Sequence, residues 1–148
     1  MRRHIVVVML LFVSLSSSKA NTPPASPAVV SVIQLIATPE KFDGKLISVI
    51  GFLRLEHEGY LLYLSKNDYD NVVLANALWV DATEDMGKNR EKLELRYVKL
   101  VGTFRAGHEK RNLYSPGGIT DIKNCQFWSD PDHPLESRIK SMHDSDSR

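Results

Sequence analysis

Two short stretches hold the residues best suited to bind a metal. One is the sequence EHE at residues 56–58, and the other comprises Asp130, Asp132 and His133. A metal site needs three or four ligands that converge with fixed geometry. Neighbouring residues at a strand end point to opposite sides, so the first stretch converges poorly. These side chains are expected to be solvated turn charges, and the sequence predicts neither a metal nor a cofactor.

Other catalytic patterns are also missing from the sequence. Nucleophilic catalysis needs a nucleophile beside a base and a group that orients the base. No serine stands in a G-x-S-x-G turn, and the histidines that follow residue 20 lie in turns, loops or the tail. Cys125, the only cysteine, is close to Phe127 on a predicted strand, and is expected to be a buried small hydrophobe rather than a reactive thiol. We therefore expect no enzyme.

Two loops resemble ligand-binding motifs only in part. The sequence KNDYDN at residues 66–71 lacks the glycine and the distant glutamate of an EF-hand, so a plain turn is predicted there. The sequence SPGG at 115–118 lacks the Lys-Ser/Thr of a phosphate-binding loop.

The first twenty residues predict a cleaved secretory signal peptide. Arg2 and Arg3 precede an apolar run at 5–13, and small residues Ser18 and Ala20 place the cut after Ala20. A run of nine apolar residues is too short for the roughly 20 needed to span a bilayer, so no stable membrane anchor is expected after cleavage. The chain is expected to be periplasmic or secreted, and residues 21–28 to be a flexible Pro/Ser/Ala linker.

The charge of the mature chain argues against nucleic acid as a partner. Cleavage removes three positive charges and leaves 16 Lys and Arg against 18 Asp and Glu, a formal net charge of −2. Nucleic-acid binding depends on clustered positive charge. The expected partner is instead a protein or an envelope component.

Hydrophobic periodicity predicts one domain that is mainly β. Apolar residues at 29, 32, 33 and 36 share a helical face, although Ser31 is an alternative start for this helix, which Pro39 ends. Period-two patterns predict five strands, at 45–55, 60–64, 76–82, 95–105 and 118–127, with a polar or helical stretch at 84–92. Gly51 and Gly102 lie inside the two long strands, where a small barrel bends sharply.

The passages PEKFDGKLISVIGFL, LYLSKNDYDN, LWVDA, YVKLVGTF and GGITDI together resemble a family of bacterial exported OB-fold-like proteins. In that family a short helix and a P-x-x-[YF]-D-G-K turn precede the first barrel strand. The resemblance covers about residues 30–128. It implies that residues 29–128 form a five-stranded OB-like barrel, and it brings no catalytic residues.

Residues 129–148 are predicted to be a polar C-terminal tail. Leu135, Ile139 and Met142 have helical spacing, which leaves a partner-binding helix as the alternative to a frayed, weakly docked segment.

Strand alternation turns a set of aromatic and cationic side chains outward. They form a hypothetical platform for stacking and cation–π contact with a partner. The alternative is that a helix, the loops or the tail cover these rings. The set comprises Phe52, Arg54, Tyr63, Trp79, Tyr97 and Lys99.

The expected function is that of an exported, non-catalytic module that binds a protein, peptide or glycan through an outer barrel face. Fold analogy supports this expectation. An immunity or inhibitor protein that neutralises a toxin in the periplasm is the alternative. A hydrolase or metal-dependent enzyme, and a single-stranded nucleic-acid binder, are two further hypotheses that the sequence disfavours.

Overall fold

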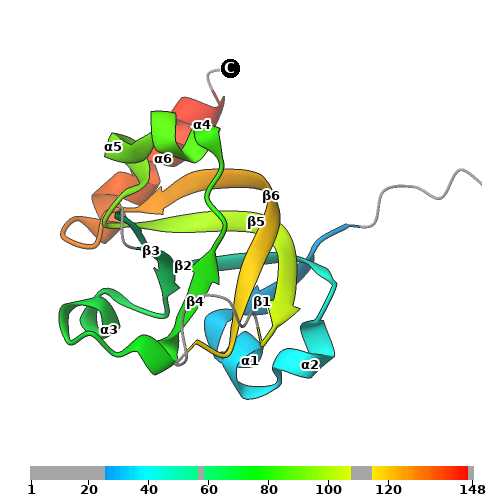
Figure 1. Ribbon diagram of the computed structural model, residues 1–148. Coiled ribbons are helices and arrows are strands. Elements are labelled where there is room, and N and C mark those ends of the chain that lie inside the picture. The colour runs from blue at the N-terminus through cyan, green and yellow to red at the C-terminus, as the bar shows by residue number, and fades with distance from the viewer. Residues whose placement is uncertain (1–25, 57–58, 108–114, 147–148) are drawn as a thin grey trace, which may run out of the picture.

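A computed structural model describes residues 26–56, 59–107 and 115–146. The predicted signal peptide, most of the predicted linker, His57 and His108 lie outside these residues. The mainly β class is confirmed, because a six-stranded mixed sheet with a few helices forms the molecule (Figure 1).

The strands follow the order β1-β2-β3-β4-β6-β5 in the sheet, and β2 also pairs with β5. The strands β2, β3, β4, β6 and β5 therefore close a ring of pairings. The contacts β1–β2 and β4–β6 are parallel, and the others are antiparallel. The strand bounds are Ala28–Ser31 (β1), Leu46–Glu56 (β2), Gly59–Tyr63 (β3), Ala77–Val80 (β4), Arg96–Ala106 (β5) and Gly117–Ser129 (β6). The five predicted strands are thus present, with ends shifted by one or two residues.

The strand β1 corrects the prediction for the start of the domain. Ala28 pairs with Ile47 instead of ending a linker, and the helix expected from Val29 begins only at Val32, as α1 (Val32–Ala37). Ser31 caps this helix, because its hydroxyl accepts a bond from the Gln34 backbone N–H at 3.2 Å. The Gln34 side chain in turn accepts from the Ser31 N–H at 2.9 Å, which completes a capping box. The alternative start at Ser31 is the correct one.

A tight turn after α2 (Pro39–Phe42) delivers the chain to β2. Gly44 has a φ of +70°, which glycine adopts without steric cost. Its N–H donates to the Phe104 carbonyl at 2.9 Å, and the Asp43 carboxylate accepts from the Ala106 N–H at 3.0 Å. The turn is therefore fixed to the end of β5.

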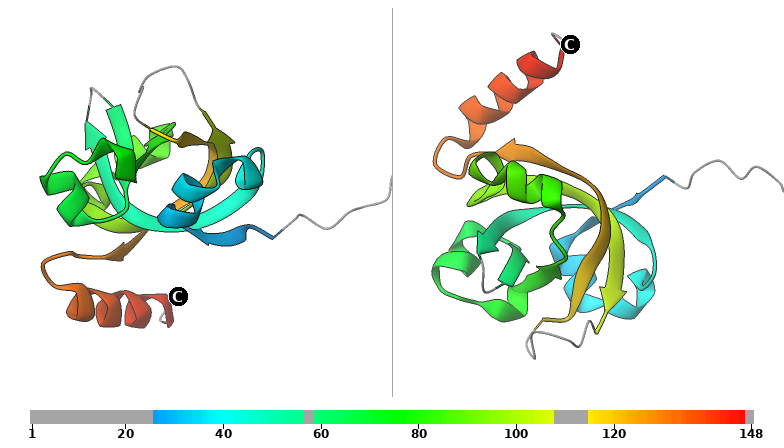
Figure 2. Two further views of the ribbon diagram at one scale, coloured as in Figure 1. Left: turned by 90° about the horizontal axis from the view of Figure 1, so that it is seen from below. Right: turned by 45° about the horizontal axis from the view of Figure 1, so that its top comes forward.

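Among the described residues, five further helical segments connect or flank the strands. They are α3 (Lys66–Asp70), the 3-10 helix η1 (Leu74–Asn76), α4 (Glu84–Lys88), α5 (Arg90–Leu93) and α6 (Pro134–Asp146). The plain turn predicted at 66–71 is therefore largely the helix α3. The tail that was predicted to be frayed contains the 13-residue helix α6. In Figure 2, α6 lies as a separate layer outside the strands. None of the helices in the described parts of the chain has the length and apolarity needed to cross a membrane.

Two hydrophobic clusters lie on opposite faces of β2. The first cluster includes Ile47, Val49, Leu53 and Leu55 of β2, together with residues of α1, alternate residues of β4 (Leu78 and Val80) and the inward residues of β5. The second cluster is smaller, and consists of Phe52, Leu61, Tyr63, Ala77 and Trp79. Alternating side chains on β2 thus face opposite clusters, as the period of a strand requires.

Candidate functional site

Phe52, Tyr63 and Trp79 face away from the first cluster, but they are buried. Tyr63 is 1 % exposed and Trp79 8 %. The segment 66–76 covers them: the Tyr69 ring on α3 lies 5.4 Å from the Phe52 ring and 5.6 Å from the Tyr63 ring, between centroids. The rings of Phe52, Tyr63 and Trp79 are therefore covered, as in the alternative to an exposed platform.

Arg54 and Tyr97 make internal contacts in or beside this covered region. Arg54 forms an ion pair with Glu56, and the hydrogen bond to that carboxylate raises the pKa of Arg54 above its ordinary value. The Tyr97 hydroxyl accepts a bond from the Lys66 backbone N–H at 3.1 Å, at the start of α3. The rings of Tyr97 and Phe52 lie 5.5 Å apart. The two residues therefore take part in internal contacts on the predicted face.

Lys99 is exposed, unlike the rest of the predicted set. It lies opposite Ile50 on β2 and opposite Gln126 on β6, and Ile50 lies opposite Ser31 on β1. A row of four residues therefore crosses four strands on one face. Ile50 and Phe52 are two positions apart on β2, so this row continues the same face beyond the part that α3 covers.

The helix α6 overhangs this open half of the face and makes it concave. Arg138 docks the helix: its guanidinium lies 3.8 Å from the centroid of the Trp128 ring and donates to the Trp128 carbonyl at 3.2 Å. The hollow beneath the helix has a volume of about 340 Å³. It is lined by Lys99, Gln126, Phe127, Trp128, Arg138, Ser141, Met142 and Ser145.

A second hollow of about 330 Å³ adjoins the first and shares Lys99 and Trp128 with it. Its other walls are Val29, Val30, Ser31, Ser48 and Ile50, from β1 and β2. We call the two hollows together the outer groove. Val29 and Met142, 86 % and 57 % exposed, give both ends of the groove an apolar surface.

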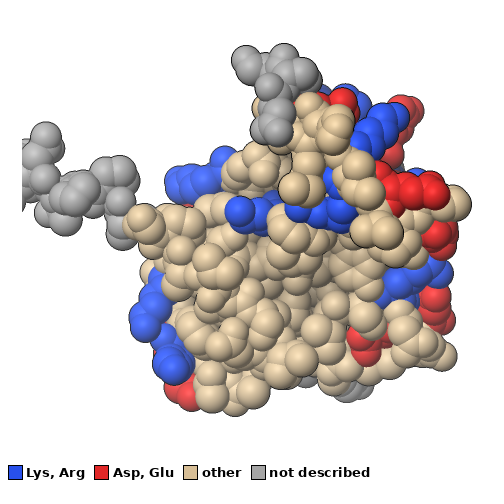
Figure 3. Space-filling view, turned by 180° about the vertical axis from the view of Figure 1, so that it is seen from behind, with Lys and Arg blue, Asp and Glu red and all other residues tan. Residues whose placement is uncertain are grey.

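The charge of the outer groove is positive. Lys99 and Arg138 line it, and neither set of lining residues includes an aspartate or a glutamate. The ion pairs found among the described residues involve neither cation. Figure 3, which shows the molecule from behind, has Lys and Arg atoms in a band across the upper part of the face, while Asp and Glu lie mostly toward its margins. Such a surface attracts carboxylates and other anions.

The residues considered for metal binding or catalysis have structural roles where the structure describes them. Asp130 pairs with Arg96 at 3.2 Å and accepts from the Asp132 N–H at 2.9 Å. Burial raises the pKa of the Cys125 thiol to about 12, and this side chain packs against the first cluster. Within residues 26–56, 59–107 and 115–146, no group of three His, Cys, Asp or Glu side chains is placed to hold a metal.

Sequence reasoning found Lys99 but missed Trp128 and Arg138. A signal for both was present, since Trp128 extends the alternation of the last strand and Arg138 lies in the helical spacing of the tail. Their pairing depends on how the tail folds back, which no local pattern specifies. Comparisons with protein-family models and with curated proteins found no match to this chain.

Proposed function

We propose that the chain is an exported, non-catalytic binding module that recognises an acidic protein, peptide or glycan through the outer groove. The observation that carries the proposal is the pair of cations, Lys99 and Arg138, in a concave surface of mixed polar and apolar side chains without a carboxylate in its lining. Aromatic and apolar residues supply contact area, and two cations that form no ion pair among the described residues supply orientation and steering.

The proposed fold is a five-stranded OB-like barrel with β1 added at its edge. Counting from β2, the ring of pairings runs first, second, third, fifth, fourth and back to the first strand. The helices α4 and α5 lie between the third and fourth of these strands. This order supports an OB-like topology, and small barrels of that kind commonly serve as binding modules.

Export to the periplasm or the medium is part of the proposal, and it rests on residues 1–20 of the sequence. N-terminal sequencing of the protein recovered outside the cytoplasm tests it. The expected first residue is Asn21. A protein outside the cytoplasm that begins at Met1 would contradict cleavage, and recovery only from the cytoplasm would contradict export.

The binding function is tested by affinity capture from a periplasmic extract, with the chain as bait. The variant Lys99→Glu reverses one charge at the centre of the groove. Lys123→Glu is the matched control, because Lys123 is exposed on β6 but does not line the groove. We expect the first variant to lose the captured partner and the second to retain it, with both thermal midpoints close to that of the parent chain.

The same capture separates the two classes of partner. Retention on peptidoglycan or another envelope glycan supports the binding module. A single stoichiometric protein, whose toxicity the chain suppresses, supports an immunity or inhibitor protein instead. Equal capture by the parent chain and by Lys99→Glu would overturn the outer groove as the binding surface.

A further inference from the structure

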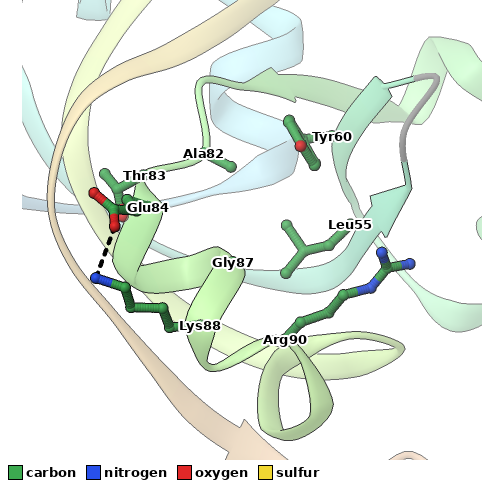
Figure 4. A pocket seen from close by; sticks show the side chains of 8 residues that line it. All are labelled: Leu55, Tyr60, Ala82, Thr83, Glu84, Gly87, Lys88 and Arg90. Atoms are coloured by element: carbon green, nitrogen blue, oxygen red, sulfur yellow. Dashed lines mark ion pairs between the residues drawn. The ribbon is translucent and has the colours of Figure 1, made fainter.

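A separate pocket of about 560 Å³ lies between α4 and the place where β2 ends and β3 begins (Figure 4). It shares no lining residue with the outer groove. Its walls are formed by Leu55, Tyr60, Ala82, Thr83, Glu84, Gly87, Lys88 and Arg90. This volume falls in the range of roughly 300–1,000 Å³ that small-molecule sites occupy.

The inner wall of the pocket is apolar. Leu55 belongs to the first cluster and is 2 % exposed. In Figure 4, Leu55 and Tyr60 come from neighbouring strands and lie across the pocket from Gly87. Tyr60 is partly buried and packs against the first cluster, so its ring is supported from behind. An apolar group that enters the pocket would therefore meet a supported wall.

Gly87 lines the opposite side of the pocket, on the helix α4. The helix α4 is anchored by the Thr83 cap, which accepts from the Met86 N–H at 3.3 Å, and by Met86, which is buried in the first cluster. At the next residue, a Cβ added to Gly87 would meet no atom within 4 Å. The pocket thus extends to the backbone of α4.

The rim of the pocket carries two cations and one carboxylate. Lys88 pairs with Glu84 at 2.8 Å, and these side chains are 69 % and 84 % exposed. Arg90 pairs with Glu94, which does not line the pocket. The exposed Lys88–Glu84 pair is weak, so a ligand anion can replace Glu84 at small cost. Arg90 holds Glu94 through two hydrogen bonds in a partly buried pair, so it acts mainly as a fixed positive charge at the rim.

We propose that this pocket binds a small amphipathic carboxylate, such as a medium-chain fatty acid. The apolar body lies between Leu55, Tyr60 and Gly87, and the carboxylate lies at the rim near Lys88 and Arg90. This site is independent of the partner surface proposed for the outer groove.

The first experiment fills the pocket. Decanoate, below its micelle concentration, is titrated into the chain by isothermal calorimetry, and one saturable site per chain is expected. Gly87→Leu adds a bulky side chain at a position that lines the pocket, and is expected to weaken binding at least tenfold with an unchanged thermal midpoint. Gly87→Ala adds a single methyl group in open space and is the matched control, expected to bind within a factor of about three of the parent chain.

The second experiment separates the charge from the apolar contact. Removing both rim cations by Lys88→Gln with Arg90→Gln is expected to weaken decanoate binding about tenfold and to leave 1-decanol binding unchanged. Lys92→Gln removes one charge from an exposed position of α5 outside the pocket, and is expected to change neither. The proposal is overturned if the parent chain shows no saturable decanoate site or if Gly87→Leu binds normally. It is also overturned if Lys99→Glu abolishes the binding, because the ligand would then lie in the outer groove.

Discussion

Arg138 stacks on Trp128 and donates to the backbone carbonyl of the same residue, with the guanidinium carbon 3.8 Å from the ring centroid and a hydrogen bond of 3.2 Å. The two contacts join α6 to the end of β6. The apolar residues Leu135, Ile139 and Met142 of this helix are exposed, so apolar packing contributes little to its docking. Arg138 thus makes the ring contact at this docking point, and the Ser137 hydroxyl adds a second anchor by accepting a hydrogen bond from the Asp130 N–H at 2.9 Å.

Replacing this arginine is expected to release α6. Arg138→Ala removes a cation–π contact of about 0.5–2 kcal/mol together with a hydrogen bond. Amide exchange measured by NMR should show at least a tenfold loss of protection in α6, with little change in the ring of strands. Lys140→Ala, at an exposed position of the same helix, is the control and should retain protection. Equal protection in both variants would show that Arg138 does not hold the helix.

Valine in place of Gly51 or Gly102 is expected to destabilise the domain. A Cβ at Gly51 would lie 2.7 Å from the Tyr63 carbonyl oxygen, and one at Gly102 would lie 2.9 Å from that of Thr120. Backbone atoms cannot move aside as a flexible side chain can, and overpacking of this kind costs about 1–3 kcal/mol or more. Urea unfolding measures the loss, and Gly87→Ala, which meets open space, should show none. Unchanged stability of both valine variants would contradict the close strand packing.

Alanine in place of Tyr63 is expected to destabilise the fold by about 3–5 kcal/mol, because it deletes a fully buried ring from the second cluster. Trp79→Ala should do the same. If these rings formed an exposed platform, the same two variants would instead lose partner binding and keep the thermal midpoint of the parent chain. Tyr63→Phe is the control, since it retains the ring. A midpoint unchanged in Tyr63→Ala would mean that the ring is not part of a packed cluster.

The strands could be predicted because the alternation of apolar and polar residues along each strand is a local feature of the sequence. Period-two alternation locates β2 and β5, and it also assigns Phe52 and Tyr63 to the face opposite Leu53 and Leu62. The start of the domain was harder. Four apolar residues between 29 and 36 fit a helical face, yet Val29 is in a strand because β2 offers it a partner that is distant in sequence.

The site was predicted only in part, because the helix α3 is short and because the docking of α6 depends on a long-range contact. The five-residue helix α3 is too short to show a hydrophobic period, so Tyr69 gave no sign that it would cover Phe52 and Tyr63. Lys99 is accessible because α3 does not extend over the row of residues formed by Ser31, Ile50, Lys99 and Gln126. The other wall of the groove depends on the long-range contact between Arg138 and Trp128, which a frayed tail would not make.

Cys125 is expected to be unreactive in the folded chain. Burial raises the pKa of its thiol to about 12, so the reactive thiolate is scarce at pH 8. Ellman's reagent should therefore modify the native protein very slowly and the urea-unfolded protein quickly, because an unfolded thiol has a pKa near 8.5. Comparable rates for the two states would show that the side chain is accessible.

Asp68 secures the segment that covers the second cluster. Its buried carboxylate accepts hydrogen bonds from the Ser65 hydroxyl and, at 2.6 Å, from the Asn76 amide. The residue thus links the N-terminus of α3 to the end of η1. These hydrogen bonds lower the pKa of Asp68 below its ordinary value, with Ser65 as the largest cause.

The stability that Asp68 contributes is therefore expected to depend on pH. Because the folded-state pKa is lower than the unfolded value of about 3.9, the contribution is complete above that value and is lost as pH falls through the folded-state pKa. Urea unfolding from pH 6 to pH 2.5 should show Asp68→Asn less stable than the parent chain at pH 6, by about 1–3 kcal/mol. The difference should shrink steadily below pH 4. Asp70→Asn removes a carboxylate of the same helix that makes only an exposed pair with Lys66, and should cost less than about 1 kcal/mol at pH 6. A difference between Asp68→Asn and the parent chain that stays constant down to pH 2.5 would show that the ionised carboxylate does not stabilise the cover.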